Sequence, residues 1–299
     1  MAAPDDRWTR AMRRGDYELA WQVGAEALAA RDPATRDDPA QPYHLRWVWD
    51  GSPFDGRHVL VRCYHGLGDT LQFARYLPLL AERTASVTLE APPRLAELLG
   101  HLPGVDCLVP FDPAHPLPPS ECDIEIMELA FALRTAPGRV PPPYLHAAPA
   151  PLPSSCVALC YEAGEWDPAR SVPPTLLTEL CSERPCLSLV PGATDLPVLN
   201  PEGCPLDMAL TASWIGGVEL VITVDTMIAH LAGAMNKPAW LLLKHDPDWR
   251  WAPAATGSDW YPSMRLYVQE NPGDWGSVID RVLTDLRADT PARSQRSGG

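Results

Sequence analysis

HVLVRCY, residues 58–64, is a short apolar run typical of a buried strand, and HGLGD, residues 65–69, is a glycine-rich turn directly after it. The next stretch, TLQFARYLPLLAER (70–83), has the apolar spacing of an amphipathic helix. A strand, a turn and a helix in this order indicate a parallel α/β sheet covered by helices. Ligands bind such sheets beyond the carboxyl ends of the strands, so the turn is a candidate site.

The same alternation continues along the chain in two similar halves. We predict further strands at 86–90, 105–109, 124–127, 157–161, 186–189, 220–224 and 239–243. We predict further helices at 93–100, 173–181, 205–215, 226–235 and 275–287. Between the halves, residues 137–153 carry seven prolines in seventeen positions, which is typical of a stiff linker.

These patterns divide the chain into five predicted parts. They are an N-terminal helical arm (1–46), a first α/β lobe (47–140), a proline-rich linker (141–153), a second α/β lobe (154–287) and a disordered tail (288–299). Within the arm, Gly15 and Asp16 separate two helices, so the arm is expected to be a hairpin. This hairpin is similar to one tetratricopeptide unit, and an ordinary helical arm is the alternative.

The composition is that of a folded, acidic protein. The chain has 299 residues, of which 46% are hydrophobic and 21% charged, and its net charge is −14. We expect no binding to nucleic acid, because phosphate binding needs a basic surface. The sequence has no run of 18 apolar residues and no apolar stretch near its start, which favours a cytoplasmic location. Eight scattered cysteines without a CxxC pair favour reduced thiols and no bound metal.

Four residues of the glycine-rich turn are candidates for binding or catalysis. Gly66 and Gly68 allow the backbone to approach a ligand closely. Asp69 stands where the following helix begins, so it is either a catalytic group or a helix cap. His65 either contacts substrate or ends the strand.

The second half repeats this arrangement at VITVDT (221–226). Asp225 ends a strand, Thr226 opens a helix, and His230 lies one turn further on. Asp225 and Thr226 could bind hydroxyls or phosphate oxygens, because the helix N-terminus favours a diphosphate there. The alternative is a capped helix with a core histidine.

Two other segments of the second half are candidates for the donor side. Arg170 and Ser171 follow its first strand, in EAGEWDPARS (162–171), where a cation could neutralise a leaving phosphate. The alternative for Arg170 is a solvated loop charge. The aromatic loops DWRW (248–251) and WYPSMR (260–265) could stack on a base or sugar, or could join the two halves.

The order and wording of these motifs resemble glycosyltransferase family 9, the heptosyltransferase-like enzymes, and in particular the branch usually associated with tetratricopeptide repeats. The resemblance spans about residues 47–286. It rests on GLGDTLQFARYLPLL (66–80), ARSVP (169–173), VITVDTMIAHLAGAMNKPAWLLL (221–243), DWRW, WYPSMRL and GDWGSVIDRV (273–282). It implies the GT-B fold, two Rossmann-like lobes with a central cleft, here with a short N-terminal helical hairpin.

The resemblance also implies roles for individual residues. Asp69 corresponds to the proposed general base of this family, and Arg170, beside Ser171, to the basic residue on the donor phosphates. Asp225, Thr226 and His230 correspond to residues that line the donor pocket.

The resemblance implies that the acceptor binds in the first lobe, and we assign the turn residues His65, Gly66 and Gly68 to this acceptor side. Several positions depart from the family pattern. His65 stands where this branch usually has glutamine, and Met227 replaces a glycine. Glu165 and Trp166 occupy the place of threonines in the lipopolysaccharide enzymes.

The implied reaction is an inverting, metal-independent transfer of a heptose-like sugar from a nucleotide-diphosphate donor, such as ADP-heptose, to a hydroxyl of a glycan or protein. The donor is a substrate, and no cofactor is expected. A non-catalytic GT-B binding module is one alternative, and another nucleotide-sugar enzyme, such as an epimerase or hydrolase, is a second. The sequence does not indicate an oligomeric state.

The first helix is unusually basic for this acidic chain. Arg7, Arg10, Arg13 and Arg14 crowd it and could touch anionic lipid. Peripheral membrane contact is the most that this pattern predicts, and a solvated helix face is the favoured alternative.

Overall fold

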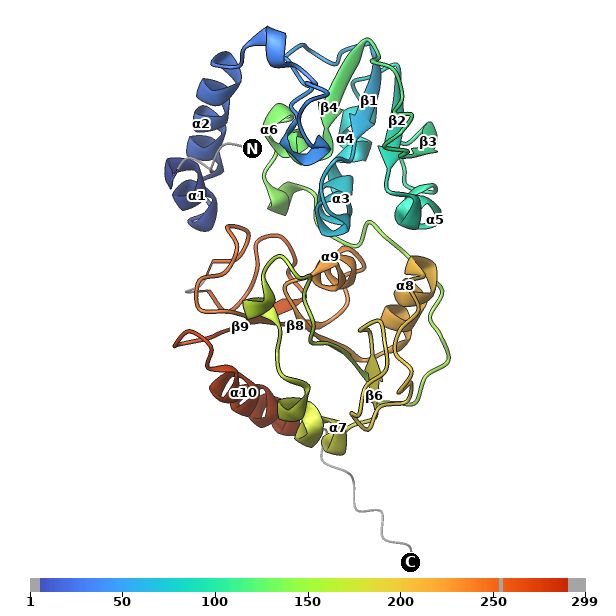
Figure 1. Ribbon diagram of the computed structural model, residues 1–299, viewed down its shortest axis with the longest axis vertical. Helices are drawn as coiled ribbons and strands as arrows, with labels where there is room; N and C mark the ends of the chain where they lie inside the picture. The colour runs from blue at the N-terminus through green and yellow to red at the C-terminus, as the bar shows by residue number, and fades with distance from the viewer. Residues whose placement is uncertain (1–5, 253–254, 290–299) are drawn as a thin grey trace, which may run out of the picture.

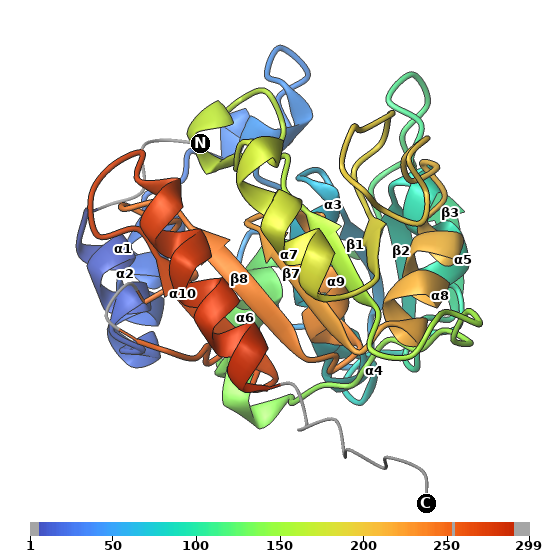
Figure 2. The ribbon, with the colours of Figure 1, turned by 90° about the horizontal axis from the view of Figure 1, so that it is seen from below.

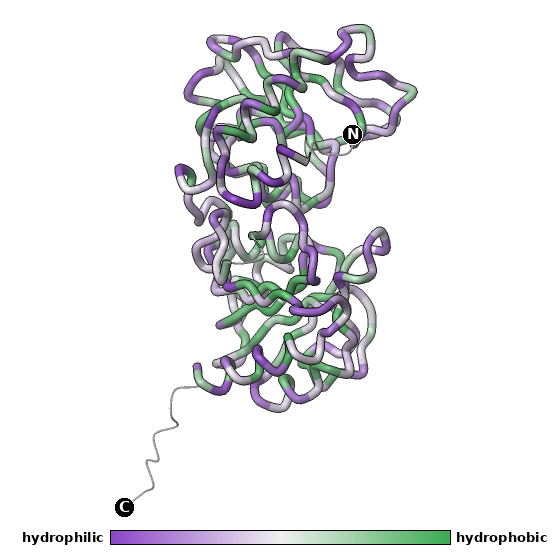
Figure 3. Tube along the Cα trace, turned by 90° about the vertical axis from the view of Figure 1, so that its left-hand side faces the viewer, coloured by the Kyte–Doolittle hydropathy of each residue, from purple (hydrophilic) through white to green (hydrophobic). Residues whose placement is uncertain are grey.

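The computed structural model describes residues 6–252 and 255–289. Figure 1 shows two α/β lobes, one above the other, with a helical hairpin beside the upper lobe. In each lobe the hydrophobic stretches run through the interior, as Figure 3 shows. These stretches are the apolar strand and helix residues that the sequence pattern assigns to buried faces.

The first lobe contains a four-stranded parallel sheet in the order β3-β2-β1-β4. Its strands are β1 (His58–Arg62), β2 (Ser86–Ala91), β3 (Cys107–Pro110) and β4 (Cys122–Glu125). Val61 in the central strand pairs with Leu89 on one side and Ile124 on the other, and all three are buried. The helices of this lobe are α3 (Leu67–Phe73), α4 (Leu77–Ala81), α5 (Ala96–Leu99) and α6 (Leu129–Ala132).

The second lobe contains a five-stranded parallel sheet in the order β6-β5-β7-β8-β9. Its strands are β5 (Val157–Cys160), β6 (Cys186–Ser188), β7 (Leu220–Val224), β8 (Ala239–Leu243) and β9 (Met264–Val268). Its helices are α7 (Thr178–Glu183), α8 (Met208–Gly217), α9 (Met227–Ala234) and α10 (Trp275–Ala288). Helices α7 and α10 lie on the face away from the first lobe, and α9 lies on the face toward it (Figures 1 and 2).

Short 3-10 turns join these elements at Pro33–Thr35, Tyr43–Leu45, Ala74–Tyr76, Pro93–Leu95, Ile126–Glu128, Pro137–Arg139, Pro168–Arg170 and Pro174–Leu177. Residues 141–156 link the lobes without a helix or strand. Helix α3 of the first lobe packs on α9 of the second, so the helices that follow β1 and β7 meet where the lobes join.

The predicted hairpin is present as α1 (Asp6–Arg13) and α2 (Tyr17–Ala29). The side chain of Asp16 accepts a hydrogen bond from the backbone N–H of Leu19 at 3.2 Å, which begins the second helix. No contact of the hairpin bears on its tetratricopeptide likeness, which stays a prediction, as do the predicted domain boundaries. In the predicted tail, residues 290–299 lie outside the described part of the chain.

All predicted strands are present, with ends displaced by two residues or fewer. The single helix predicted over 70–83 is wrong, because the structure has α3, a 3-10 turn and then α4. Pro78 sits in the first turn of α4, where its missing N–H costs nothing, whereas inside one long helix it would break a hydrogen bond.

The prediction of a loop over 260–265 is wrong for its last two residues, because strand β9 begins at Met264. This strand lies at the edge of its sheet and exposes Arg265 between the buried Met264 and Leu266. A charged residue on an edge strand interrupts the run of apolar residues by which a buried strand is predicted, so this strand was missed.

Candidate active site between the two lobes

A cavity of about 1250 Å³ lies between the hairpin and the two lobes. The residues that line it include most of those predicted from sequence: His65, Gly66, Gly68, Asp69, Arg170, Asp225, Thr226 and His230. Ser171 is not among the lining residues, because its hydroxyl accepts the backbone N–H of Ala163 at 3.0 Å and so shapes the loop behind the cavity. The expectation that Ser171 touches the donor therefore finds no support in its position.

Asp69 faces this cavity from the start of α3. Gly66 is the N-cap residue of the helix, and its backbone N–H donates to Asp69 Oδ2 at 3.0 Å. Asp69 therefore does cap the helix, from the third helical position rather than from the N-cap itself. Its other oxygen, Oδ1, forms an ion pair with Arg250 of the second lobe.

Gly68 brings the two lobes together. A methyl group at this position would lie 2.8 Å from His230 Cδ2 and 3.4 Å from Met227 Cα, both on α9. Only a residue without a side chain allows α3 to approach α9 this closely. The structure thus gives Gly68 a role in joining the lobes, beside its predicted place at the acceptor.

We expect Gly68→Ala to lower the stability of the protein by about 1–3 kcal/mol, because the new methyl group must push α3 away from α9. Thermal unfolding measures the effect. Gly138→Ala is the matched control, since no atom lies within 4 Å of a methyl group there. Equal melting temperatures for both variants would contradict tight packing at Gly68.

The His65 side chain contacts a carboxylate of its own lobe. Its Nδ1 lies 3.0 Å from Glu125 Oε1, at the end of the neighbouring strand β4. Burial lowers the pKa of His65, but the hydrogen bond and charge of Glu125 outweigh it, so the pKa stands above its usual value. The ring therefore pairs with Glu125 while one side still lines the cavity.

Asp225 and Thr226 open helix α9 on the second lobe. Thr226 is its N-cap, and its hydroxyl accepts the backbone N–H of Ile228 at 3.2 Å. Burial raises the pKa of Asp225 to about 6, and the charge of Asp248 adds to this, while Arg250 and Arg170 oppose it. An aspartate that is costly to ionise and lines a cavity is a candidate functional group.

We expect Asp225→Asn to stabilise the protein at neutral pH. The folded-state pKa of Asp225, about 6, exceeds the ordinary value of 3.8, so its contribution to stability is full below pH 4 and is lost as the pH rises through 6. The variant should gain about 1–3 kcal/mol at pH 7.5 and nothing near pH 4. Urea unfolding at both pH values measures this, and a pH-independent difference would contradict it.

His230 is buried, and its surroundings keep it neutral. Its ring stacks on Trp251 with centroids 5.7 Å apart, and its Nδ1 lies 3.0 Å from the Tyr261 hydroxyl. Burial lowers the pKa of His230 well below its usual value, and Arg250 and Arg75 lower it further. The core-histidine alternative describes this residue well, although its edge still reaches the cavity.

Arg170 is buried, with 8% of its surface exposed, so the solvated-charge alternative is wrong. Its Nη1 donates to the carbonyl oxygen of Asp225 at 2.6 Å, and its guanidinium lies 4.0 Å from the ring centroid of Trp166. Trp166 lines the cavity and is 77% exposed. Glu165 is exposed and is not among the residues that line the cavity.

The aromatic loops mainly join the lobes. Trp251, Trp260 and Tyr261 are buried, and Arg75 of the first lobe donates to the carbonyl oxygen of Trp260 at 2.9 Å. Trp249 is half-buried and lines the cavity. Stacking on a base or sugar is therefore open to Trp249. Trp260 and Tyr261 contact Phe73 and Arg75 of the first lobe, and Trp260 also lines the cavity.

Arg250 is the site residue that the sequence analysis missed. It lines the cavity and binds Asp69 across the cleft, 181 residues away along the chain. The DWRW motif contains it, but among flanking tryptophans it reads as part of an aromatic loop. Only the contact with Asp69 marks it as part of the site.

The N-terminal hairpin forms a wall of the cavity and touches both lobes. Arg13 donates to the carbonyl oxygen of Pro247 at 2.5 Å, and Trp8 meets Trp249 edge to face with ring centroids 4.9 Å apart. On the other side Arg31 pairs with Glu128 of the first lobe at 2.7 Å. A hairpin of this length cannot bury its own apolar face, and the two lobes supply the missing partner.

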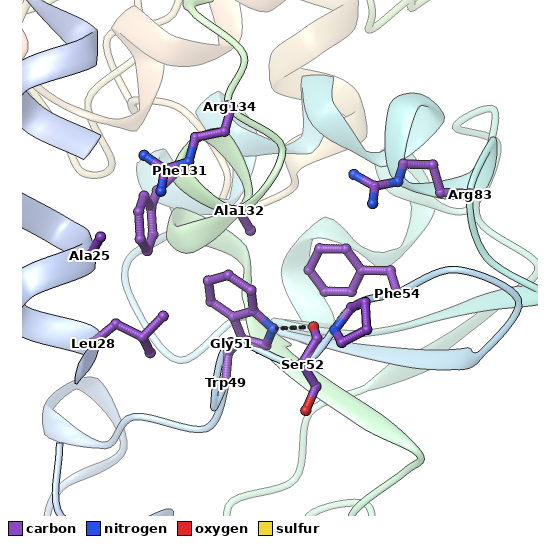
Figure 4. Close-up of a pocket in the computed structure, with 11 residues that line it drawn as sticks. Ala25, Leu28, Trp49, Gly51, Ser52, Phe54, Arg83, Phe131, Ala132 and Arg134 are labelled. Carbon is purple, nitrogen blue, oxygen red and sulfur yellow. Dashed lines mark hydrogen bonds between the residues drawn. The ribbon is translucent and has the colours of Figure 1, made fainter. Parts of the chain in front are cut away.

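A smaller cavity of about 260 Å³ lies between the hairpin and the first lobe. Figure 4 shows the rings of Trp49, Phe54 and Phe131 around it, with Arg83 and Arg134 approaching from two sides. It contains none of the candidate residues.

Among residues 6–252 and 255–289, no group of three or more His, Cys, Asp and Glu side chains could hold a metal ion. No helix within the described ranges is long and apolar enough to cross a membrane.

The sequence comparisons give one partial relative. No family model matches the chain. Protein FlbA of Caulobacter vibrioides is 30% identical over 129 residues, which are 41% of this chain and 21% of FlbA. The chain therefore spans about a fifth of the curated relative it matches.

Solved structures match more than three quarters of the chain. A glycosyl transferase of family 9 from Veillonella parvula matches with a TM-score of 0.57 and 11% identity, over 79% of this chain and 98% of that one. ADP-heptose lipopolysaccharide heptosyltransferase II of E. coli matches with a TM-score of 0.53 and 15% identity, over 77% and 98%.

TibC of enterotoxigenic E. coli H10407, described as an iron-containing dodecameric glycosyltransferase, matches with a TM-score of 0.56 and 11% identity, over 79% and 77% of the two chains. At these identities the likeness concerns the fold. The resemblance to glycosyltransferase family 9 is confirmed at that level, and the tetratricopeptide association is not tested. The chain has the GT-B fold of the family 9 glycosyltransferases, with two Rossmann-like lobes around a cleft.

Proposed function

We propose that this protein is an inverting glycosyltransferase that moves a sugar from a nucleoside-diphosphate donor to an acceptor hydroxyl. One observation carries the proposal: a single cavity is lined by Asp69 from the first lobe and by Arg170 and Thr226 from the second. This is the arrangement needed to place a proton acceptor on one side of a reacting sugar and a cation on the other.

In the proposed reaction, Asp69 takes the proton of the acceptor hydroxyl as that oxygen attacks the anomeric carbon of the sugar. The bond between the sugar and the donor phosphate breaks, and the nucleoside diphosphate leaves with its electrons. Arg170 and the N-terminus of α9, capped by Thr226, stabilise the negative charge that develops on the phosphate. None of these steps involves a metal ion in the proposal.

The donor proposed is ADP-heptose or a close relative. Neighbouring structures are titled as heptosyltransferases, one of them in complex with an ADP-heptose. Trp249 and Trp166 line the cavity from the second lobe, where the donor would bind and its base would stack.

The acceptor proposed is a glycan or a protein, bound between the first lobe and the hairpin. This wall is rich in aromatic side chains, among them Trp8, Tyr17 and Trp21. Its cations are already paired within the protein, Arg31 with Glu128 and Arg46 with Asp37. Such a wall suits an acceptor that presents uncharged surface rather than phosphate groups.

Arg170→Ala should weaken nucleoside-diphosphate binding by about 1.5–3 kcal/mol, roughly 10- to 150-fold in Kd, because the proposed charge-assisted contact with the donor phosphates is lost. Calorimetry with ADP and with other nucleoside diphosphates measures this. Arg287→Ala is the matched control, because Arg287 pairs with Glu179 and Glu183 on the far side of the second lobe. Unchanged affinity in the Arg170 variant would remove this residue from the site.

The alternatives make different predictions. A non-catalytic binding module would have no reason to place Asp69 and Arg170 in the same cavity, which favours an enzyme. An epimerase or hydrolase would change the donor with water alone. Incubating the protein with a panel of nucleotide sugars, with and without acceptors, and analysing the products tests all three. Donor binding without any product would leave the binding module, and a product formed without acceptor would indicate an epimerase or hydrolase.

Cytoplasmic location and peripheral membrane contact remain predictions. Arg7 pairs with Glu26, and Arg13 pairs with Asp246. These pairs favour the solvated-face alternative. Binding to neutral and anionic liposomes in parallel would distinguish the two.

A further inference from the structure

Arg250 joins the two lobes at the proposed base. Its guanidinium group uses three nitrogen atoms on three different oxygens. Nη2 pairs with Asp69 Oδ1, Nε donates to Gln72 Oε1 at 2.6 Å, and Nη1 donates to Asp248 Oδ1 at 2.8 Å. Because the guanidinium group is planar and its donors have fixed directions, these three contacts fix the orientation of both partners on α3, Asp69 and Gln72.

The two partners on α3 are presented together by the helix. Asp69 and Gln72 are three residues apart, so they lie on the same face of α3 and point at the second lobe. The Gly66 N–H holds the other carboxylate oxygen of Asp69 at 3.0 Å. The carboxylate is therefore held from its own lobe by a backbone N–H and from the opposite lobe by Arg250.

Arg250 is itself held in place by its surroundings. Its guanidinium lies 4.2 Å from the ring centroid of Trp249, which packs against Trp8 of the hairpin and Trp260. Arg13 of the hairpin binds the carbonyl oxygen of Pro247 in the same loop. The loop that carries Arg250 is thus fixed by the hairpin on one side and by the first lobe on the other.

We infer that Arg250 is a positioning residue for the transfer reaction, which holds the Asp69 carboxylate from the opposite lobe in the orientation that receives the acceptor proton. This inference rests on the proposed function, in which Asp69 is the base. It implies that the base is correctly placed only when the two lobes are together. A direct role on the donor phosphates is the competing one, but all three nitrogens of Arg250 already have partners within the protein.

The test is a double-mutant cycle on sugar transfer. Arg250→Gln should lower kcat by roughly 10- to 100-fold through misplacement of the carboxylate, with donor KM and ADP affinity within about twofold of the wild type. In the Asp69→Asn background, the same change should lower kcat by no more than about threefold, because Arg250 acts through Asp69. Arg250→Lys should recover part of kcat, since an ammonium keeps the charge but cannot reach all three oxygens.

Arg75 supplies the matched control. It is another buried arginine that crosses between the lobes, to the Trp260 carbonyl oxygen, and it does not contact Asp69. The effects of Arg75→Lys and Asp69→Asn should multiply, whereas those of Arg250→Lys and Asp69→Asn should not.

Two results would overturn the inference while the proposed function stands. In the first, the factors by which the Arg250 and Asp69 substitutions lower kcat multiply in the double variant. In the second, a loss of donor affinity accounts for the whole effect of Arg250→Gln. A folded wild-type protein that binds no nucleotide and consumes no nucleotide sugar would overturn the proposed function, and the inference with it. Melting temperatures of every variant separate these outcomes from unfolding.

Discussion

Asp69→Asn should lower turnover by roughly 10²- to 10⁴-fold, because an amide cannot take the proton of the acceptor hydroxyl. Its side-chain oxygen can still accept the Gly66 N–H, and asparagine caps helices about as well as aspartate does. Arg250 loses one carboxylate but keeps Asp248, so we expect a small change in melting temperature. The measurement is kcat beside donor affinity and thermal unfolding.

Asp207→Asn is the matched control for this variant. Asp207 caps α8 by accepting the Leu210 N–H at 3.0 Å, and it is not among the residues that line the cavity. Both variants therefore replace a helix-capping aspartate, but only one of them removes the proposed base. Wild-type turnover in a folded Asp69→Asn protein would leave Asp69 with its capping role and the proposed mechanism without a base.

Arg62→Met should destabilise the protein by about 3–5 kcal/mol, because it leaves two buried carboxylates without their cation. Arg62 is 1% exposed, and it pairs with Glu90 at 2.9 Å and with Asp123 at 2.9 Å. It also donates to the Leu117 carbonyl oxygen at 3.1 Å, so it ties the loop before β4 to the sheet. Urea unfolding measures the loss.

Arg83→Met is the comparison for this prediction. Arg83 pairs with Asp55 at 3.1 Å, but both side chains are exposed, and ion pairs in water contribute little. We expect its unfolding midpoint to stay close to that of the wild type. Similar losses in the free energy of unfolding for the two variants would contradict the prediction that the buried ion pairs of Arg62 contribute more to stability than the exposed pair of Arg83.

The position of the site followed from local sequence, whereas its internal contacts did not. The turns at Gly66–Asp69 and Asp225–Thr226 each follow a strand, and parallel sheets place such turns at one edge. The helices that these turns open do meet, with Gly68 of α3 against Met227 and His230 of α9. Yet the pairing of Asp69 with Arg250, and the turn of Ser171 toward Ala163, depend on how loops pack after the strands are in place.

The alternation of strands and helices could be predicted from the amino-acid sequence alone, because each element buries one face and so repeats its apolar residues at a fixed spacing. The sequence also predicted two aspartate-bearing helix starts that face the cleft, at Asp69 and at Asp225. The tertiary structure alone pairs Arg62 with two buried acids and makes the hairpin a wall of the cavity. It alone decided that Arg250 reaches Asp69. These contacts join residues far apart in the chain. The spacing of apolar residues within one segment does not indicate which distant side chain will pair with a buried charged group.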